Sequence, residues 1–248
     1  MSNQEFSDLF DTMLNSYANQ AQFGEQASKT EIALDEYEKS VFLTHAQDMV
    51  VKSFFDRKKN ATGDGFDDNT ERQIDFSSLI KTADAQRAED QSNTFDDRGI
   101  IYTMPMDILF ILNEKLVCTT GNFNRNYVIV PLNYKEYDRE MSKPYSQPLK
   151  RQAWRLFQNK TCGFDLQSEL IPRWNLTEKE TISAYKIRYV RRPTPIILVD
   201  LPNGMEIDGC SDEMECELNP ILHPEIIQRA VELAYASRGR VSRDADNQ

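Results

Sequence analysis

Residues 34–58 read LDEYEKSVFLTHAQDMVVKSFFDRK, and this stretch decides how the rest of the chain is interpreted. Asp35 is a favoured helix N-cap, and Glu38 lies three residues later, where a capping box places its carboxylate. Apolar side chains then recur every three or four residues, which is the spacing of one helix face. We predict a helix of about six turns whose core stripe is Tyr37, Val41, Phe42, Met49, Val50 and Phe54.

Both ends of the chain also carry helical patterns. Ser2 and Glu5 form a second capping box ahead of an amphipathic stretch, and the polar residues 18–33 follow it as a linker. Near the other end, Pro220 and Pro224 open a pattern of apolar residues that runs to residue 237. Gly239 is a typical helix stop. We therefore expect helices from both chain ends to pack together.

The middle of the chain has the texture of strands. Short β-branched or aromatic runs are separated by turn residues, and a charged helix is expected over residues 133–143. We also expect an edge strand with a loop within residues 82–93, and a helical turn from Pro105 to Phe110. In the last run, residues 181–189, Lys186 and Arg188 alternate with Tyr185, Ile187 and Tyr189. Such alternation is typical of a sheet with one wet face.

These patterns predict an α+β fold: a helical bundle from both chain ends with a central antiparallel β insertion. The expected segments are an amino-terminal helix and linker (1–33), the first part of the bundle (34–97), the β-rich insertion (98–200), the carboxy-terminal helix that completes the bundle (201–239) and a polar tail (240–248).

Composition narrows the classes of function. The chain has 248 residues, is 40% hydrophobic and carries a net charge of −11. A general nucleic-acid binder shows the opposite charge balance, so tight DNA binding is not expected. No apolar run reaches the roughly 18 residues of a membrane span, and no signal-peptide core is present. We therefore expect no membrane association, and assembly in the cytoplasm that makes the chain.

Residues typical of catalysis are sparse. His45 and His223 are the only two histidines, and both fit structural roles on or beside helices. No phosphate-binding glycine loop or nucleophile elbow is present. Asp64, Asp67 and Asp68 lack the spacing of a calcium-binding EF-hand loop, and Cys210 and Cys216 lack a second ligand pair. We predict no enzyme activity, no metal site and no cofactor.

Six blocks of sequence, in order from Leu34 to Ala236, resemble one family. They are LDEYEKSVFLTHAQDMVVKSFF, GFDDNTERQIDFSSLI, MPMDILFILNE, YDREMSKPYSQPLKRQAWRL, YKIRYVRRPTPIIL and CELNPILHPEIIQRAVELA. The family is the virion neck proteins of crAss-like phages of gut Bacteroidetes. These are similar in plan to the tail-tubular adaptors of short-tailed podoviruses.

The resemblance implies a structural virion protein. Such an adaptor, or head-to-tail connector, forms a homo-dodecameric ring below the portal, extends the DNA channel and docks the next tail or neck ring. The double-stranded DNA would pass through without tight binding. The basic residues Lys186, Arg188, Arg191 and Arg192 would then face a protein partner; a solvated strand face is the alternative. Two other functions stay open: another virion component, such as a head-bound or cargo protein, and a cytosolic phage enzyme.

Overall fold

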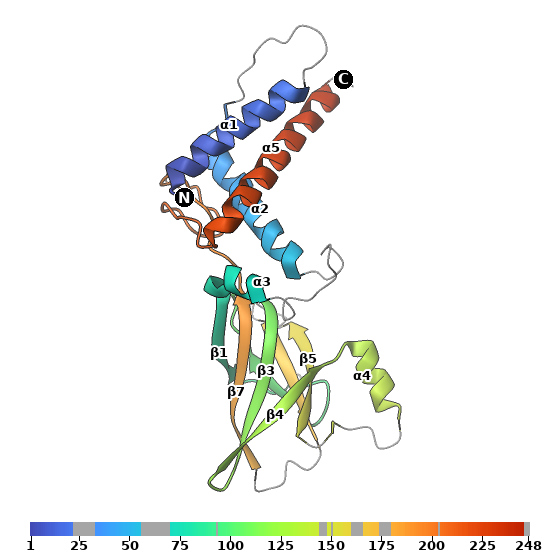
Figure 1. The fold of residues 1–248 in the computed structure, drawn as a ribbon. Coiled ribbons are helices and arrows are strands. Elements are labelled where there is room, and N and C mark those ends of the chain that lie inside the picture. The colour runs from blue at the N-terminus through green and yellow to red at the C-terminus, as the bar shows by residue number, and fades with distance from the viewer. Residues whose placement is uncertain are drawn as a thin grey trace. The chain divides into compact units, whose positions relative to one another are not determined.

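The structure is a computed structural model. It describes residues 1–21, 33–55, 70–92, 94–143, 148–149, 151–159, 166–173, 180–202 and 204–245. The chain divides into two compact units, which Figure 1 shows with their elements labelled. The helical unit consists of residues 1–79 and 192–248, and the barrel unit is residues 80–191.

Helices from the two ends of the sequence meet in the helical unit. They are α1 (Asn3–Ala21), α2 (Glu36–Phe55), α3 (Thr70–Asp75) and α5 (His223–Ala245), with the 3-10 turns η2 (Ser77–Leu79) and η3 (Pro220–Leu222). Helix α5 packs against both α1 and α2 (Figure 1). Fully buried apolar side chains fill these contacts, among them Phe6, Phe10, Leu14, Leu43, Ala46, Val50, Ile226, Ala230 and Val231.

The helix starts follow the predicted capping chemistry. At α1, the Ser2 N–H donates to Glu5 Oε2 at 2.9 Å, and the Glu5 N–H donates to Ser2 Oγ at 3.3 Å. At α2, the Asp35 N–H donates to Glu38 Oε2 at 3.3 Å. These bonds satisfy N–H groups that a helix start leaves without partners. The predicted stop at Gly239 is wrong, because α5 continues to Ala245.

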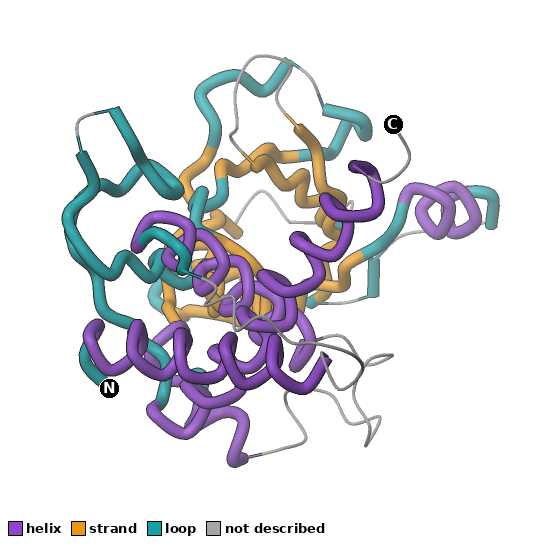
Figure 2. Tube along the Cα trace, turned by 90° about the horizontal axis from the view of Figure 1, so that it is seen from above, coloured by secondary structure: helices purple, strands orange, loops and turns teal. Residues whose placement is uncertain are grey.

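The described part of the barrel unit forms seven strands. They are β1 (Ile80–Arg87), β2 (Ile100–Thr103), β3 (Ile108–Thr120), β4 (Phe123–Pro131), β5 (Gln152–Asn159), β6 (Leu166–Pro172) and β7 (Glu180–Arg191). They close in the order β1-β2-β6-β5-β4-β3-β7 and curve around a common axis, as Figure 2 shows from above. Only β4 and β5 among these neighbours pair in parallel.

Helix α4 (Tyr134–Met141) lies outside the ring of strands, in the connection from β4 to β5 (Figures 1 and 2). Parallel neighbours cannot be joined by a tight hairpin and need a crossover connection, which α4 supplies. The predicted helix over residues 133–143 is confirmed. Its start is a capping box, in which the Asn133 N–H donates to the Glu136 side chain at 2.9 Å.

Alternation along β7 sets the inner and outer faces of the barrel. Tyr185, Ile187 and Tyr189 are buried inside with side chains from the other strands, as the sequence predicts. Their neighbours in the interior cluster include Ala85, Tyr102, Met104, Leu116, Tyr127, Ile129, Ala153 and Leu170. Lys186 and Arg188 lie between these positions, on the outer face.

The predicted fold class is wrong. The centre of the chain is a closed seven-stranded barrel, not an antiparallel insertion in a helical bundle. The strand expected at an edge within residues 82–93 is β1, which pairs with both β2 and β7. The expected helical turn from Pro105 to Phe110 is also wrong, since β3 begins at Ile108. Closure depends on pairing between strands far apart in sequence, and a period-two pattern carries no information on it.

Candidate assembly surfaces

The predicted basic cluster divides between different environments. Lys186 lies between Asp84 of β1 and Lys115 of β3 in the strand register, and Arg188 lies between Thr82 and Asn113. Lys115, Lys186 and Arg188 therefore share the outer face of the barrel, and we call them the basic strip.

Arg191 and Arg192 do not belong to this strip. Arg191 pairs with Ile108 at the end of β7 and has the opposite alternation to Lys186 and Arg188. Arg192 is the first residue of the helical unit after the barrel. The structure thus brings together Lys186 and Arg188, and it adds Lys115, which sequence analysis missed.

The predicted apolar stripe of α2 is not its buried face. Val50 is fully buried and Tyr37, Phe42 and Phe54 are half-buried, but Val41 is 39% and Met49 is 37% exposed. Four polar residues are buried instead: Lys39, Ser40, Thr44 and Gln47. The prediction that Val41 and Met49 are core residues is therefore wrong for the single chain.

Hydrogen bonds to an extended segment, residues 194–198, explain this rotation of the buried face. Ser40 Oγ accepts from the Leu198 N–H at 3.0 Å, and Thr44 Oγ1 accepts from the Ile196 N–H at 3.1 Å. Gln47 Nε2 donates to the Thr194 carbonyl at 2.7 Å. Buried backbone groups need such partners, so polar side chains occupy positions that apolar periodicity assigns to solvent.

Val41, His45 and Met49 consequently form an exposed stripe along α2. They follow each other at four-residue spacing, which places them on one side of a helix, and all three are exposed. Val41 and Met49 are apolar, so this face is suited to contact with another protein surface.

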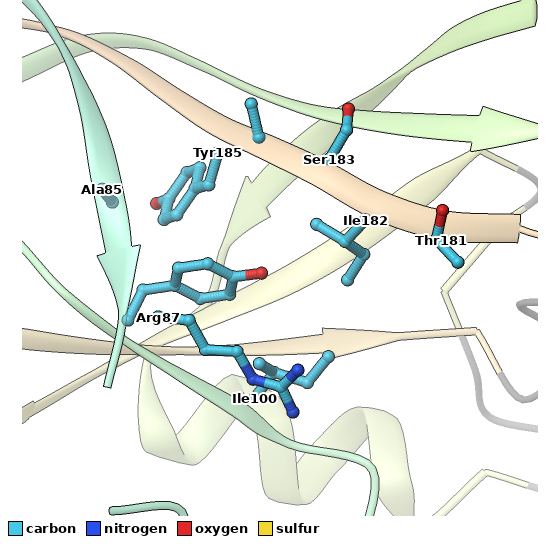
Figure 3. Close-up of a pocket in the computed structure, with 9 residues that line it drawn as sticks. Ala85, Arg87, Ile100, Thr181, Ile182, Ser183 and Tyr185 are labelled. Carbon is cyan, nitrogen blue, oxygen red and sulfur yellow. The ribbon is translucent and has the colours of Figure 1, made fainter. Parts of the chain in front are cut away.

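A hollow in the barrel unit opens between β7, the end of β1 and the start of β2. This pocket has a volume of about 460 Å³ and is lined by Ala85, Arg87, Ile100, Tyr102, Thr181, Ile182, Ser183, Ala184 and Tyr185. Figure 3 shows Ile182 and Tyr185 projecting from β7 on the side where Arg87 and Ile100 lie. Tyr102 and Tyr185 stack edge to face, with ring centroids 5.2 Å apart. The walls combine apolar side chains with the hydroxyls of Thr181 and Ser183 and one arginine.

Aromatic side chains are exposed beside α4. Phe95 is 60% and Tyr134 is 54% exposed, and their ring centroids lie 6.5 Å apart. The Tyr134 hydroxyl donates to the carbonyl of Phe157, whose own ring is also exposed. The Phe157 ring itself lies against the Arg155 guanidinium, on the other face of β5, so we call Phe95 and Tyr134 the aromatic patch. Aromatic residues are enriched in protein interfaces.

A buried charged network fixes the aromatic patch to the barrel. Arg98 donates to both carboxylate oxygens of Asp96, at 2.8 and 2.6 Å, and the Tyr137 hydroxyl donates to Asp96 at 2.6 Å. Glu169 of β6 accepts from the backbone N–H groups of Phe95 and Asp96 at 3.0 and 2.9 Å. The loop that carries Phe95 is thereby held on β6, which makes the patch a rigid surface.

The pKa values of this network follow from burial and pairing. Burial alone would raise the pKa of Asp96, but its bonds to Arg98 and Tyr137 outweigh that effect and lower the pKa to about 2. Burial raises the pKa of Glu169, in spite of its two backbone hydrogen bonds. Neither carboxylate lines the barrel pocket. Their shifted pKa values therefore have a structural explanation.

Comparison with known proteins identifies the family. A family model described as phage tail ring protein 3/4 matches residues 1–246. The chain belongs to this family. It is 43% identical over 241 residues to "Ring protein 4/5" of Bacteroides phage crAss001, covering 96% of this chain and 93% of that protein. It is 34% identical over 249 residues to "Ring protein 3" of the same phage, covering 98% of both.

Membership of the phage tail ring protein family confirms the predicted relationship to crAss-like phage neck proteins. It assigns the chain a structural role in a ring of the phage tail or neck, and hence a place in the virion. Surfaces that bind other protein copies are therefore the functional sites to consider. The aromatic patch and the pocket were missed by sequence analysis, although exposed-loop aromatics such as Phe95 and Phe123 were a possible signal.

The interior of the ring protein's barrel is filled with side chains. Arg155 Nε lies 2.9 Å from Glu114 Oε2, and both side chains are only 6% exposed. The Tyr185 hydroxyl donates to Glu114 Oε1, and burial raises the pKa of Tyr185. Small barrels are packed cores rather than pores. The barrel of a single copy is therefore a packed core and not a channel.

Groups with catalytic or ligand-binding potential are few in the described parts of this ring protein. Within these ranges, no three His, Cys, Asp or Glu side chains gather closely enough to hold a metal ion. The described cysteines, Cys118, Cys210 and Cys216, carry thiols, and burial raises the pKa of Cys216 to about 11. The Asp64, Asp67 and Asp68 loop lies outside the described residues. No described helix combines the length and apolar character needed to span a membrane.

Proposed function

We propose that copies of this chain form a closed homomeric ring of about twelve subunits that acts as a head-to-tail connector below the portal. The observation that carries the proposal is the match to the tail ring family over residues 1–246. Two relatives in one phage bear the names of different rings. That number of ring types suits a stacked neck in which each ring docks on the next.

The exposed surfaces support a role in assembly. The aromatic patch and the stripe Val41, His45 and Met49 are apolar or aromatic surfaces of a single chain. Solvent exposure of such groups is unfavourable unless they are covered in the assembly. Obligate interfaces of over about 2,000 Å² would cover several such surfaces at once.

Electrostatics favours a channel through which DNA slides. With a net charge of −11 per copy, a ring would repel phosphate wherever acidic groups face the lumen. Each charge acts over about 8 Å at physiological salt, so only lumen-facing residues matter. The basic strip Lys115, Lys186 and Arg188 is then expected to contact acidic groups of a neighbouring copy or ring.

Copy number tests this function. Quantitative mass spectrometry of purified virions should give a ratio of about one between this chain and the portal protein, for rings of equal symmetry. A few copies, or hundreds, per particle would contradict a single adaptor ring and favour a cargo or head-bound protein. The assembly is expected to lie in the neck, where cryo-electron microscopy would locate it.

The basic strip is tested by charge reversal. Lys186→Glu together with Arg188→Glu should weaken capture of the portal protein or the next ring in a pull-down, with no DNA binding to lose in a low-salt gel shift. Arg191→Glu with Arg192→Glu is the comparison, because those residues lie outside the strip. Submicromolar DNA binding that disappears in the Lys186→Glu, Arg188→Glu variant, with docking intact, would place the strip in the lumen and contradict the assignment.

A further inference from the structure

Strands β7, β3 and β4 form a sheet that continues past the closed part of the barrel. β3 pairs with β7 down to Thr120 and Glu180, at the far end of both strands. The pairing of β1 with β7 stops at Ala85 and Tyr185, where β1 turns away to pair with β2. Within the described ranges, no strand therefore pairs with residues 181–184 of β7 on the side away from β3.

β4 has a matching edge on the opposite side of the same sheet. It pairs with β3 from Phe123 onward, but its pairing with β5 begins only at Val128. Alternate residues of an antiparallel ladder direct their N–H and C=O groups away from the partner strand. The Val128 N–H does so, donating to the Arg151 carbonyl at 3.0 Å. By the same alternation, Asn124 and Asn126 direct their backbone groups to that side, where no described strand pairs with them.

Shape adds a second complementarity between the two edges. Phe123, at the start of the β4 edge, is 75% exposed. The pocket of about 460 Å³ lies beside the β7 edge, and its walls include Ile100, Tyr102 and Ile182. Figure 3 shows Ile100 and Ile182 on the same side of the unpaired part of β7. One edge thus carries an exposed aromatic side chain, and the other borders an apolar hollow large enough to receive one.

The composition of both edges is unusual for strands that remain in solvent. Natural edge strands are commonly protected from association by charged residues, above all lysine, or by proline. Residues 123–127, FNRNY, and 180–184, ETISA, contain no lysine or proline, and their single charges, Arg125 and Glu180, are of opposite sign. Asn124, Asn126 and Thr181 are exposed. These edges are therefore suited to pairing with another strand.

We infer that the β4 edge of one copy adds to the β7 edge of the next copy, which extends the sheet from subunit to subunit and places Phe123 in the neighbour's pocket. This inference rests on the proposed ring. β4 and β7 point the same way, because each is antiparallel to β3. Repetition around a rotation axis keeps that direction, so the new pairing is parallel. Contact between two different edges is heterologous, the kind that closes into rings, whereas like-with-like pairing would end at a dimer.

Disulfide trapping in purified virions distinguishes these arrangements. Particles carry Asn124→Cys with Thr181→Cys, are oxidised, and are then denatured and analysed on a non-reducing gel with an antibody to the chain. The double variant should give a ladder of covalent multimers. Each single variant should give no more multimer than the native chain, whose own cysteines set the background. A second double variant, Asn124→Cys with Ser183→Cys, allows for a two-residue difference in register, which would bring Phe123 level with Ile182 of the pocket.

The outcomes separate this inference from the proposed ring. Covalent dimers from a single-cysteine variant would overturn the inference by showing like-with-like pairing. A chain that is present in virions but stays monomeric in both double variants would also overturn it, while leaving the ring in place. Absence of the native chain from virions would overturn the proposed function itself.

A proline variant tests the same edge by function. Asn126→Pro removes an N–H that points away from β3, so the hairpin should keep its own ladder and the chain its fold. Asn126→Ala keeps that N–H and is the matched control. Asn126→Pro should reduce incorporation into virions at least tenfold, with circular dichroism and tryptophan fluorescence unchanged, and Asn126→Ala should incorporate normally. Equal incorporation of both variants would contradict the inference.

Discussion

The helical unit and the barrel unit bury polar groups in different ways. In the helical unit, the uncharged side chains of Ser40, Thr44 and Gln47 bind the backbone of residues 194–198. The buried Lys39 of this unit pairs with two partly exposed carboxylates, Asp11 and Glu36. In the barrel unit, charged side chains bind each other: Glu114 with Arg155 inside, and Asp96 with Arg98 outside. The first arrangement holds an extended segment that belongs to no sheet. The second fixes side chains within a closed one.

This difference predicts which substitutions lower the stability of each unit most. Removing a neutral partner leaves one backbone group without a hydrogen bond, at a cost of about 1–3 kcal/mol. Removing one member of a buried ion pair leaves a charge without compensation, at about 3–5 kcal/mol. The two units can be followed separately, because both tryptophans, Trp154 and Trp174, belong to the barrel unit, and far-UV circular dichroism at 222 nm follows mainly the helices.

The largest effect is expected from breaking the ion pair inside the barrel. Arg155→Met should lower the free energy of unfolding of the barrel unit by about 3–5 kcal/mol, because Glu114 stays buried without its partner. Urea titration followed by tryptophan fluorescence measures the loss. The double variant Glu114→Gln, Arg155→Met removes both charges and should lose less than Arg155→Met alone. Equal losses would mean that water reaches the pair.

A smaller effect is expected from crowding the outer network. A Cβ on Gly99 would lie 1.9 Å from Glu169 Oε1 and 2.9 Å from the Asp96 carbonyl oxygen. Gly99→Ala should therefore cost the barrel about 1–3 kcal/mol, the range for an overpacked site. Gly121→Ala is the control: it has open space around it but a φ of +58°, so it should cost about 1 kcal/mol. A Gly99→Ala variant as stable as the wild type would show that Glu169 moves freely.

In the helical unit, neighbouring residues of α2 provide a matched pair. Ser40→Ala should cost about 1–2 kcal/mol, because the buried Leu198 N–H loses its acceptor. Val41→Ala should cost less than about 1 kcal/mol, because Val41 is partly in solvent in the single chain. Thermal unfolding followed at 222 nm compares them. A larger loss of stability in Val41→Ala than in Ser40→Ala would show that the apolar stripe predicted from sequence is the buried face.

The smallest effect is on pH dependence, which should differ between the units. Burial lowers the pKa of His223, which is 2% exposed and lies 3.0 Å from the Leu218 carbonyl oxygen. The unfolded chain then binds the proton more readily, so stability is present above about pH 6.5 and is lost as the pH falls below it. The lowered pKa of Asp96 changes the stability of the barrel only between pH 3.8 and about pH 2, where stability is lost as the pH falls. The raised pKa of Glu169 favours the folded barrel as the pH falls toward 4.5.

Urea titrations from pH 8 to 5.5 test that difference. The helical signal should lose stability over this range by at most about 1.4 kcal/mol per pH unit, the slope for one proton. The tryptophan signal should stay level or rise. His223→Gln should remove the loss from the helical signal. A pH response that survives in His223→Gln would assign the titration to another group.

Sequence patterns predicted local structure better than the closure of the barrel. The capping boxes at Ser2 and Asp35 and the alternation of Tyr185, Ile187 and Tyr189 depend on neighbouring residues, and they were confirmed. The parallel β4–β5 pair and the β1–β7 pair join distant residues, so no local period reports them. The fold class was wrong for that reason.

Sites were harder to predict than elements. Arg155 lies inside the barrel only because Glu114 of another strand compensates its charge, and Ser40 is buried only because residue 198 needs an acceptor. Lys186 and Arg188 could be grouped from β7 alone, whereas Lys115 joins them through the β3–β7 register. The exposed Phe123 and the pocket it is proposed to fill lie on different strands. Complementarity between two copies cannot be read from a single periodic stretch.

A cryo-electron microscopy map of the virion neck tests the proposed assembly most directly. It should show a closed ring of this chain, with strand density continuous from β4 of each copy to β7 of the next, and a lumen enclosed by several copies. A ring whose copies meet only through their helical units, with the β4 and β7 edges in solvent, would contradict the inferred pairing. A neck that contains no ring of this chain would contradict the proposed function.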